Sequence, residues 1–393
     1  MNLFTYLMAK SGNNSSVHGD LFSYLLGKGQ SQTKTLSGVT IYIPDAKKTK
    51  IAELILDKES TQAGTPTPDN PIEVNTVKGY RNLFDKDNAN KINGYIENNS
   101  GKIQSNNEAK VIWINIQPNT TYTVSKIASA RFGIATYINQ PVIGSTSTNC
   151  TNDFSATKLT ITSRSTDNYL AVWYFSSADT LTEQEILDSI MIIKGNQELP
   201  YVPYGNNYVN VAVSDGNTTI QTPIPLNNNE LVGIGTYKDE LKVDKSGHCW
   251  LNKKIPKYII SGNENWQYYA GAKMFYWTGI SDYLKIENTI MGLSNYYPVL
   301  IESSDATDFE NITNDYNYAI SFGYSSNTLR IKNIDFSNAT GLKNWLSTYK
   351  PYIYFIRETP TMIDLNTTVD IRLFKGANTI TNSEGCNMTI KYY

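Results

Sequence analysis

The chain of 393 residues contains few of the residues that build metal centres or disulfide frameworks. It has three cysteines and two histidines. Cys150, Cys249 and Cys386 lie far apart and show no metal-ligand spacing, so we expect free thiols in a protein that folds in a reducing cytoplasm. Two histidines are too few for the common histidine-based sites. We therefore expect no metal and no cofactor.

Charged residues and long apolar runs are also scarce. Charged residues make up 18% of the chain, and 34 Lys and Arg against 36 Asp and Glu leave a formal charge of −2. A nucleic-acid-binding protein would need a concentrated basic surface, which this balance does not favour. The apolar run at residues 3–9 has no basic residue before it and no cleavage site after it. It predicts neither a secretion signal nor a membrane span.

Tyrosine is abundant, with 28 residues, and Asn, Thr and Ser are frequent. Tyr and Thr favour strands, whereas Asn and Gly favour turns. This composition predicts a mainly β fold. It suits a binding surface rich in adaptable hydrogen bonds, and it suits an AT-rich genome equally well.

A short repeat occupies the N-terminal region, where residues 2–10 align with residues 20–28. Each copy starts with an Asn or Asp that can cap a helix and ends near a glycine, which predicts two short helices. Such helices need a surface to bury their apolar faces. That surface is either another protein, for which this segment is a docking peptide, or the chain's own β-domain. The candidate docking residues are Leu3, Phe4, Leu7, Leu21, Phe22 and Leu25.

A proline-rich stretch at 61–71 separates this region from the rest of the chain. Pro66, Pro68 and Pro71 exclude helix interior and central strand, so we expect a stiff surface connector. Regularly spaced apolar runs on either side predict β-sandwich or jelly-roll modules. The expected organisation is a helical N-terminal anchor at 1–35, a small β-domain made of 36–81, 206–228 and 361–393, a carbohydrate-binding-like β-sandwich at 82–205 and a second β-sandwich at 229–360.

Three local features within these modules can be compared directly with a structure. Thr182 followed by Glu185 predicts a capped helical turn. Residues 340–349 predict a short helix, and residues 369–374 predict a strand.

Catalysis would require a recognisable group of reactive side chains. Glycoside hydrolysis needs two carboxylates across a cleft, and the candidates are Glu183 with Glu185 and the group Asp305, Asp308 and Glu310. Their pattern is that of solvated surface carboxylates. The segment 305–310 also lacks the glycine and the full ligand spacing of a calcium loop. We expect no enzyme and no metal site.

Sugar binding needs less, because an aromatic face can stack on a pyranose ring while polar neighbours bind its hydroxyls. Period-2 alternation places Trp266 and Tyr268 on one face of a strand and Tyr269 on the other. An exposed face would be a binding platform, and a covered face would be core or a packing surface. The candidate glycan-binding residues are Trp266, Tyr268, Tyr276, Trp277, Trp113, Tyr137, Trp173 and Arg131.

The string Gln-Ala-Gly-Thr-Pro-Thr-Pro-Asp-Asn-Pro-Ile-Glu-Val at 62–74, followed by Asn-Leu-Phe at 82–84, resembles a motif of minor structural proteins of phages that infect Gram-positive bacteria. The segment 191–205, which ends in Pro-Tyr-Val-Pro-Tyr-Gly, is similar to the last strand of carbohydrate-binding-like jelly rolls in those proteins. The resemblance implies a tail, baseplate or receptor-binding protein, often a trimer, with its N-terminus on the particle. It does not imply any particular ligand.

The resulting hypothesis is a virion protein, assembled in the host cytoplasm, that docks on other virion proteins and binds host cell-surface polysaccharide without chemistry. The expected partners are other virion proteins, host cell-surface polysaccharide and further copies of the chain. A head fibre or purely architectural virion protein is one alternative, and a glycan depolymerase is another. A bacterial surface adhesin is a third, disfavoured by the lack of a signal peptide and wall anchor.

Overall fold

The computed structural model describes residues 30–34, 38–43, 49–98, 100–126, 131–153, 156–175, 181–279, 292–299, 316–322 and 328–392. Within them the chain is mainly β, which confirms the predicted fold class. The predicted N-terminal anchor and its docking residues lie outside the described residues. Chain contacts divide the protein into unit 1 (1–77, 213–220 and 230–393) and unit 2 (78–212 and 221–229).

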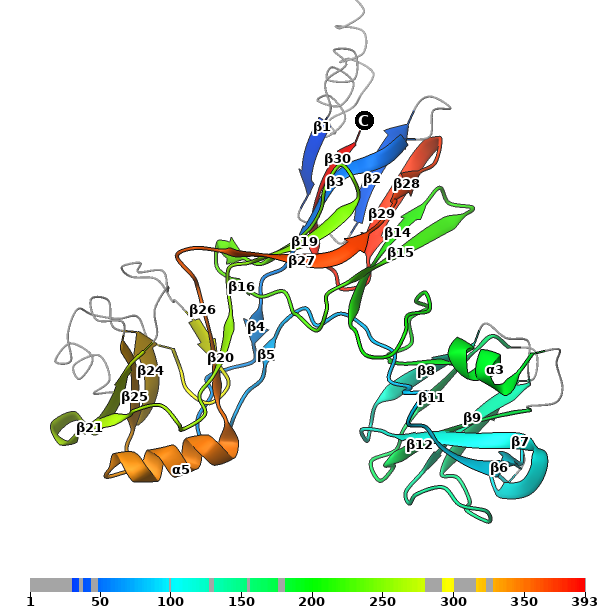
Figure 1. Cartoon of the computed structure of the whole chain (residues 1–393), viewed down its shortest axis with the longest axis horizontal. Coiled ribbons are helices and arrows are strands. Elements are labelled where there is room, and N and C mark those ends of the chain that lie inside the picture. Colours follow the sequence, from blue (N-terminus) through cyan, green and yellow to red (C-terminus); the bar gives the residue numbers. More distant parts are fainter. Residues whose placement is uncertain are drawn as a thin grey trace, which may run out of the picture. The chain divides into compact units, whose positions relative to one another are not determined.

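Unit 2 is a β-sandwich of a five-stranded and a three-stranded sheet (Figure 1). The larger sheet has the order β10-β9-β12-β7-β6, and its strands are β6 (Asn90–Ile96), β7 (Ile103–Asn115), β9 (Phe132–Tyr137), β10 (Asn149–Asn152) and β12 (Tyr169–Phe175). The smaller sheet has the order β11-β8-β13, with β8 (Thr121–Ser125), β11 (Lys158–Thr162) and β13 (Met191–Lys194). Neighbouring strands in both sheets are antiparallel.

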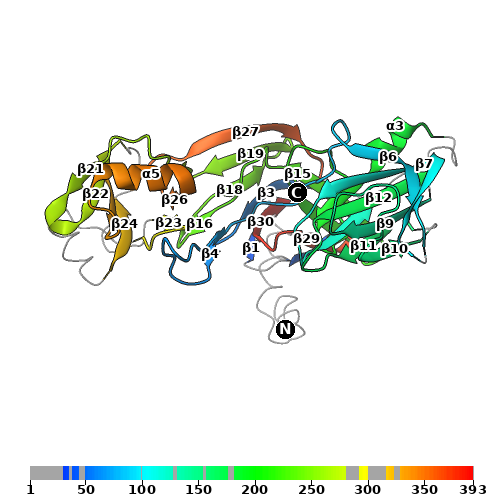
Figure 2. The same ribbon diagram turned by 90° about the horizontal axis from the view of Figure 1, so that it is seen from below.

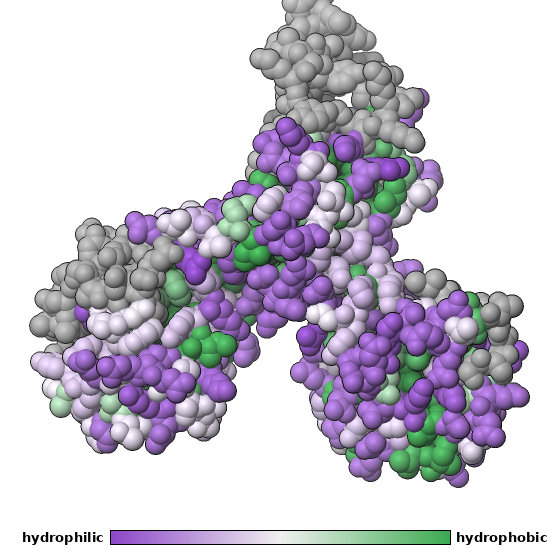
Figure 3. All heavy atoms as spheres, viewed as in Figure 1, coloured by the Kyte–Doolittle hydropathy of each residue, from purple (hydrophilic) through white to green (hydrophobic). Residues whose placement is uncertain are grey.

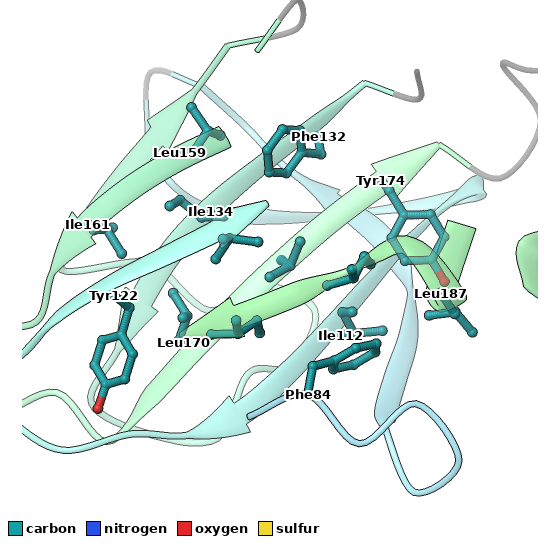
Figure 4. Close-up of a cluster of buried hydrophobic side chains, with 14 of the residues drawn as sticks. Phe84, Ile112, Tyr122, Phe132, Ile134, Leu159, Ile161, Leu170, Tyr174 and Leu187 are labelled. Atoms are coloured by element: carbon teal, nitrogen blue, oxygen red, sulfur yellow. The ribbon is translucent and has the colours of Figure 1, made fainter. Parts of the chain in front are cut away.

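Alternation along β12 explains why the larger sheet is apolar on both faces. Leu170, Val172 and Tyr174 belong to one buried cluster, which also receives Tyr122 and Val124 from the smaller sheet (Figure 4). Ala171 and Trp173, on the opposite face, join a second buried cluster. Successive side chains of a strand point to opposite faces, so a continuous apolar run covers both sides.

Helix α3 (Glu183–Ser189) adds Ile186 and Leu187 to the core of the sandwich. Its predicted start is confirmed. The hydroxyl of Thr182 accepts a hydrogen bond from the Glu185 N–H, and the Glu185 carboxylate accepts one from the Thr182 N–H. This reciprocal pair satisfies two donors that the first turn of a helix leaves free.

Unit 1 contains a seven-stranded sheet with the order β1-β30-β3-β18-β19-β27, with β28 also paired to β3. Its strands are β1 (Gln30–Lys34), β3 (Thr49–Asp57), β18 (Glu240–Val243), β19 (His248–Lys253), β27 (Thr361–Thr368), β28 (Arg372–Leu373) and β30 (Asn387–Tyr392). Strands β18 and β19 come from the expected module at 229–360, yet they pair with β3 and β27. The C-terminal strand β30 pairs with β1 and β3 of its own chain.

A four-stranded sheet has the order β15-β14-β29-β2, with β2 (Gly38–Ile43), β14 (Tyr208–Ser214), β15 (Thr219–Pro225) and β29 (Gly376–Asn382). It draws strands from all three segments that the sequence grouped into a small β-domain. The strand predicted at 369–374 is reduced to β28, with longer strands on either side of it. Just after β28, the Asn378 side chain accepts a hydrogen bond from the Phe374 N–H and donates one to the Phe374 carbonyl.

Two further sheets of unit 1 pack around an apolar core. One sheet has the order β20-β26-β23 and another β21-β22-β25-β24. Their strands are β20 (Lys257–Ile259), β21 (Gln267–Tyr269), β22 (Met274–Thr278), β23 (Gly292–Ser294), β24 (Tyr318–Phe322), β25 (Thr328–Asn333) and β26 (Tyr352–Phe355). A 3₁₀ turn, η1 (Ala270–Ala272), links β21 to β22. The predicted helix is present as α5 (Ala339–Tyr349), beside these strands in Figure 2, and it buries Leu342 and Leu346 in their core.

The proline-rich connector is a hairpin-like strap within unit 1. Strands β4 (Thr61–Gln62) and β5 (Val74–Asn75) pair at its base, while the backbones of Thr67 and Asn70 exchange two hydrogen bonds of 3.1 Å at its tip. The Gln62 amide donates to the carbonyls of Ile72 and Ser294, at 2.9 and 2.8 Å. Proline lacks an N–H donor, so the non-proline residues hold the strap. A short pair, β16 (Gly233–Ile234) and β17 (Tyr237–Lys238), completes the unit.

Candidate functional site

The aromatic residues predicted as a binding platform in unit 2 are buried. Trp113, Tyr137 and Trp173 belong to one cluster and are 6%, 1% and 2% exposed. The Trp173 indole N–H donates to Asn152 at 2.8 Å, and the Tyr137 hydroxyl donates to the Gly101 carbonyl. Stacking requires an open aromatic face, so the structure corrects this part of the prediction: these three side chains are core.

The aromatic residues of unit 1 divide between core and surface. Trp266 is 3% exposed and is also core. Trp277 is half-buried, with its ring stacked on Tyr258 at a centroid distance of 5.7 Å. Tyr268 packs against Phe275, while the Tyr276 hydroxyl bonds to Gln267. The inward face of β21 is therefore largely covered, and no open platform forms there.

The polar candidates are scattered. Arg131 is exposed, and its role in binding remains a prediction. Glu183 pairs with Lys91 at 3.1 Å, whereas Glu185 caps α3. The carboxylates at 305, 308 and 310 lie outside the described residues.

Buried carboxylates of unit 1 have structural partners. Asp239 is fully buried and accepts hydrogen bonds from the N–H groups of Val232, Lys254 and Ile255, at 3.0, 2.7 and 2.9 Å. The Lys253 ammonium lies 2.5 Å from its second oxygen. Burial raises the pKa of Asp239 despite these contacts. The Asp239 carboxylate holds two chain segments together, and this structural role is sufficient to explain why an acid is buried here.

A groove of about 470 Å³ lies in unit 2, within the range of roughly 300–1,000 Å³ that small-molecule sites occupy. It is formed where the first and last segments of the sandwich meet the ends of three strands. Its lining residues are Arg81, Asn82, Leu83, Ile114, Asn115, Ile116, Gln117, Tyr122, Lys194, Tyr204 and Gly205.

Asn82 holds the two ends of the module together at this groove. It is 2% exposed, and its backbone bridges to Tyr204 in parallel. Its side-chain amide donates to the Ile190 carbonyl at 3.1 Å and accepts from the N–H groups of Phe84 and Ile192, both at 3.0 Å. Because a buried amide needs all its partners, this residue fixes the backbone on both sides of the groove.

The groove combines apolar and polar groups in the manner of a small-ligand site. Tyr204 is 54% exposed, so its ring is accessible to a ligand in the groove. Leu83, Ile114 and Ile116 are half-buried and supply apolar surface. An exposed aromatic ring beside apolar surface and hydrogen-bonding side chains can take the two kinds of contact that a sugar ring makes.

Hydrogen bonds fix the backbone of Gln117 in the groove and link its side chain to Lys194. The Gln117 N–H donates to the buried Tyr122 hydroxyl at 2.8 Å, and the Gln117 carbonyl accepts from the Ser163 hydroxyl. The Lys194 ammonium donates to the Gln117 side-chain oxygen at 2.7 Å. Arg81 and Asn115 are exposed.

This groove was not among the sites predicted from the sequence, although two sequence motifs contain part of it. Asn82 and Tyr204 belong to the two strings that open and close the module. The usable signal was the exposure expected of a tyrosine between a proline and a glycine, Pro203-Tyr204-Gly205, where the chain must turn. Gly205 has a φ of +103°, a left-handed conformation that favours glycine.

Unit 2 also exposes aliphatic side chains between β9 and β10. Ile138, Val142 and Ile143 are 45%, 55% and 48% exposed. Figure 3 shows hydrophobic residues, in green, at the surface of this unit. These three residues do not line the groove.

Cys249 and Cys386 are buried free thiols, and burial raises the pKa of each to about 12. Within the described ranges, no group of three or more His, Cys, Asp or Glu residues is placed to hold a metal ion. The described part of the chain also has no helix with the length and apolar character needed to cross a membrane.

Comparisons with protein families, with curated proteins and with solved structures find no match to this chain.

Proposed function

We propose that the protein is a structural component of a phage virion, in the tail or baseplate, and that it binds a host cell-surface glycan. The observation that carries the binding role is the groove of unit 2, where the exposed Tyr204 lies beside apolar surface and hydrogen-bonding side chains. The resemblance of residues 62–84 and 191–205 to phage structural proteins supports the virion role.

Binding without cleavage is part of the proposal. The described residues that line the groove include no carboxylic acid, so they supply neither the acid nor the nucleophile of glycoside hydrolysis. A shallow groove binds a single sugar weakly. Several copies on one particle, such as the trimer that the resemblance implies, would raise the overall affinity through avidity.

Attachment to the particle is assigned to residues 1–35. A truncated chain that begins near residue 30 is expected to bind glycan while failing to join the particle. Immunogold labelling of virions would locate the full chain on tail or head. Labelling of the head would support the architectural alternative.

The test of glycan binding compares Tyr204→Ala with Tyr269→Ala. Tyr269 is 50% exposed and lies on β21 of unit 1, so it is a matched surface tyrosine outside the groove. Binding of the purified chain to wall polysaccharide of Gram-positive bacteria should weaken about two- to tenfold in Tyr204→Ala, the value of one aromatic contact. Tyr269→Ala should bind like wild type.

Three results would contradict the proposal. Equal binding by wild type and Tyr204→Ala would remove the groove as the site. Absence of binding by wild type to every polysaccharide would leave the purely architectural role. New reducing ends after incubation with the polysaccharide would replace binding by hydrolysis.

A further inference from the structure

Two basic side chains line the groove without a carboxylate beside them among its lining residues. Arg81 and Lys194 both line it, and no Asp or Glu is among its described lining residues. The whole chain has a formal charge of −2, so this local excess is not a consequence of a basic composition.

Three other lysines of unit 2 are paired with carboxylates, whereas Lys110 bonds to the neutral side-chain oxygen of Asn93 at 2.6 Å. Lys86 bonds to Asp188, Lys91 lies 3.1 Å from Glu183, and Lys158 lies 3.4 Å from Glu198. Lys194 instead bonds to the neutral side-chain oxygen of Gln117. A neutral acceptor positions an ammonium group and leaves its charge available.

Arg81 is similarly available. Its side chain is exposed, and it forms no hydrogen bond or ion pair with any residue in the described part of the chain. Its backbone is next to Asn82, whose three buried hydrogen bonds fix the chain at this point. The guanidinium group therefore extends from an anchored position, and its planar fork matches a carboxylate or a phosphate.

We infer that the groove selects an anionic glycan, one whose sugar carries a carboxylate or a phosphate. This inference rests on the proposed glycan-binding function. Arg81 and Lys194 bind the acidic group, the ring of Tyr204 packs against the sugar, and Asn115 and Gln117 supply hydrogen bonds to hydroxyls. Neutral sugars lose the charge-assisted contacts and bind more weakly.

The experiment uses the full chain on a glycan array in which neutral sugars stand beside their uronate and phosphorylated counterparts. The variants are Arg81→Gln, Lys194→Gln, Tyr204→Ala and the matched control Lys91→Gln, whose lysine does not line the groove. Wild type should bind the charged members preferentially. Loss of one charge-assisted contact should weaken that binding roughly tenfold in Arg81→Gln or Lys194→Gln, while Lys91→Gln keeps it.

The uronate and phosphate arms show which acidic group the groove takes, and preference for either supports the inference. Equal binding of neutral and charged sugars would overturn it. Unchanged binding by both Arg81→Gln and Lys194→Gln would also overturn the inference. If Tyr204→Ala nevertheless weakened binding, the proposed glycan-binding function would still stand. No binding to any sugar, by a wild-type chain that melts cooperatively, would remove the proposed function as well.

Discussion

The indole N–H of Trp266 donates a hydrogen bond of 3.2 Å to the carboxylate of Glu264. The same carboxylate accepts from the N–H groups of Ser261 and Gly262, at 2.8 and 2.7 Å, and from the Tyr258 hydroxyl at 3.0 Å. Glu264 itself is 7% exposed. A tryptophan that the sequence offered as a sugar platform is instead tied to a buried acid.

Glu264→Gln should destabilise unit 1. The glutamine side chain keeps one oxygen, and its NH₂ group faces donors that previously met the second oxygen. The expected loss in the free energy of unfolding at pH 7 is about 1–3 kcal/mol, the usual cost of a lost hydrogen bond to a charged group. Urea denaturation, followed by tryptophan fluorescence, would measure it. Glu358→Gln, at an exposed position of the same unit, is the control.

Comparison of wild type with Glu264→Gln also tests how stability depends on pH. Burial alone would raise the pKa of Glu264, but the hydrogen bonds from Ser261, Trp266 and Tyr258 together hold it below the ordinary value. A carboxyl with a lowered pKa in the folded state stabilises the fold above its unfolded pKa of about 4.3. That contribution is lost as pH falls through the folded value. The stability difference between wild type and Glu264→Gln should therefore shrink below about pH 4, and a constant difference would contradict the assignment.

Trp266→Ala should cost far more stability than Tyr269→Ala, although the two residues are only three positions apart in the sequence. Trp266 is buried in the core, whereas Tyr269 is 50% exposed. Removing a buried tryptophan costs about 3–5 kcal/mol, and an exposed substitution changes stability by about 0.5 kcal/mol or less. Thermal melts of both variants would show the contrast. Similar melting temperatures would mean that Trp266 is not core.

Asn82→Ala should destabilise unit 2. The substitution leaves the N–H groups of Phe84 and Ile192 and the carbonyl of Ile190 without their partner. Each buried group left unsatisfied costs about 1–3 kcal/mol, so a total above about 2 kcal/mol is expected. Asn196→Ala, at an exposed turn, should have little effect. Chemical denaturation of the two variants measures the difference, and equal midpoints would contradict this role for Asn82.

Gln62→Ala should loosen the proline-rich strap. Its amide bonds to the carbonyls of both Ile72 and Ser294 would be lost. The N–H of Ile72, which donates to the Asn295 carbonyl at 2.8 Å, should then exchange faster with solvent. Hydrogen exchange of peptides covering 61–77 would show this. Asn75→Ala, which removes one exposed contact of 3.4 Å to Thr61, should leave the exchange unchanged.

Local elements with a short-range cause were predictable from the sequence. The Thr182 and Glu185 pair specified the start of α3, and short strand-forming runs separated by turn residues located strands such as β8 and β9. The strand expected at 369–374 was too long, and at its C-terminal end Asn378 bonds back to Phe374, where the chain leaves β28. A side-chain contact of that kind leaves no periodic trace in the sequence.

The mainly β character of the chain could be predicted from the sequence, because period-2 alternation and turn residues depend on neighbours a few positions away. The tertiary structure decided which aromatic rings are open. Trp113, Trp173 and Trp266 face apolar clusters built from distant strands, and their burial depends on which face of each sheet is covered. The groove likewise exists only because Asn82 and Tyr204, at opposite ends of a module, are brought together by the closure of the sandwich.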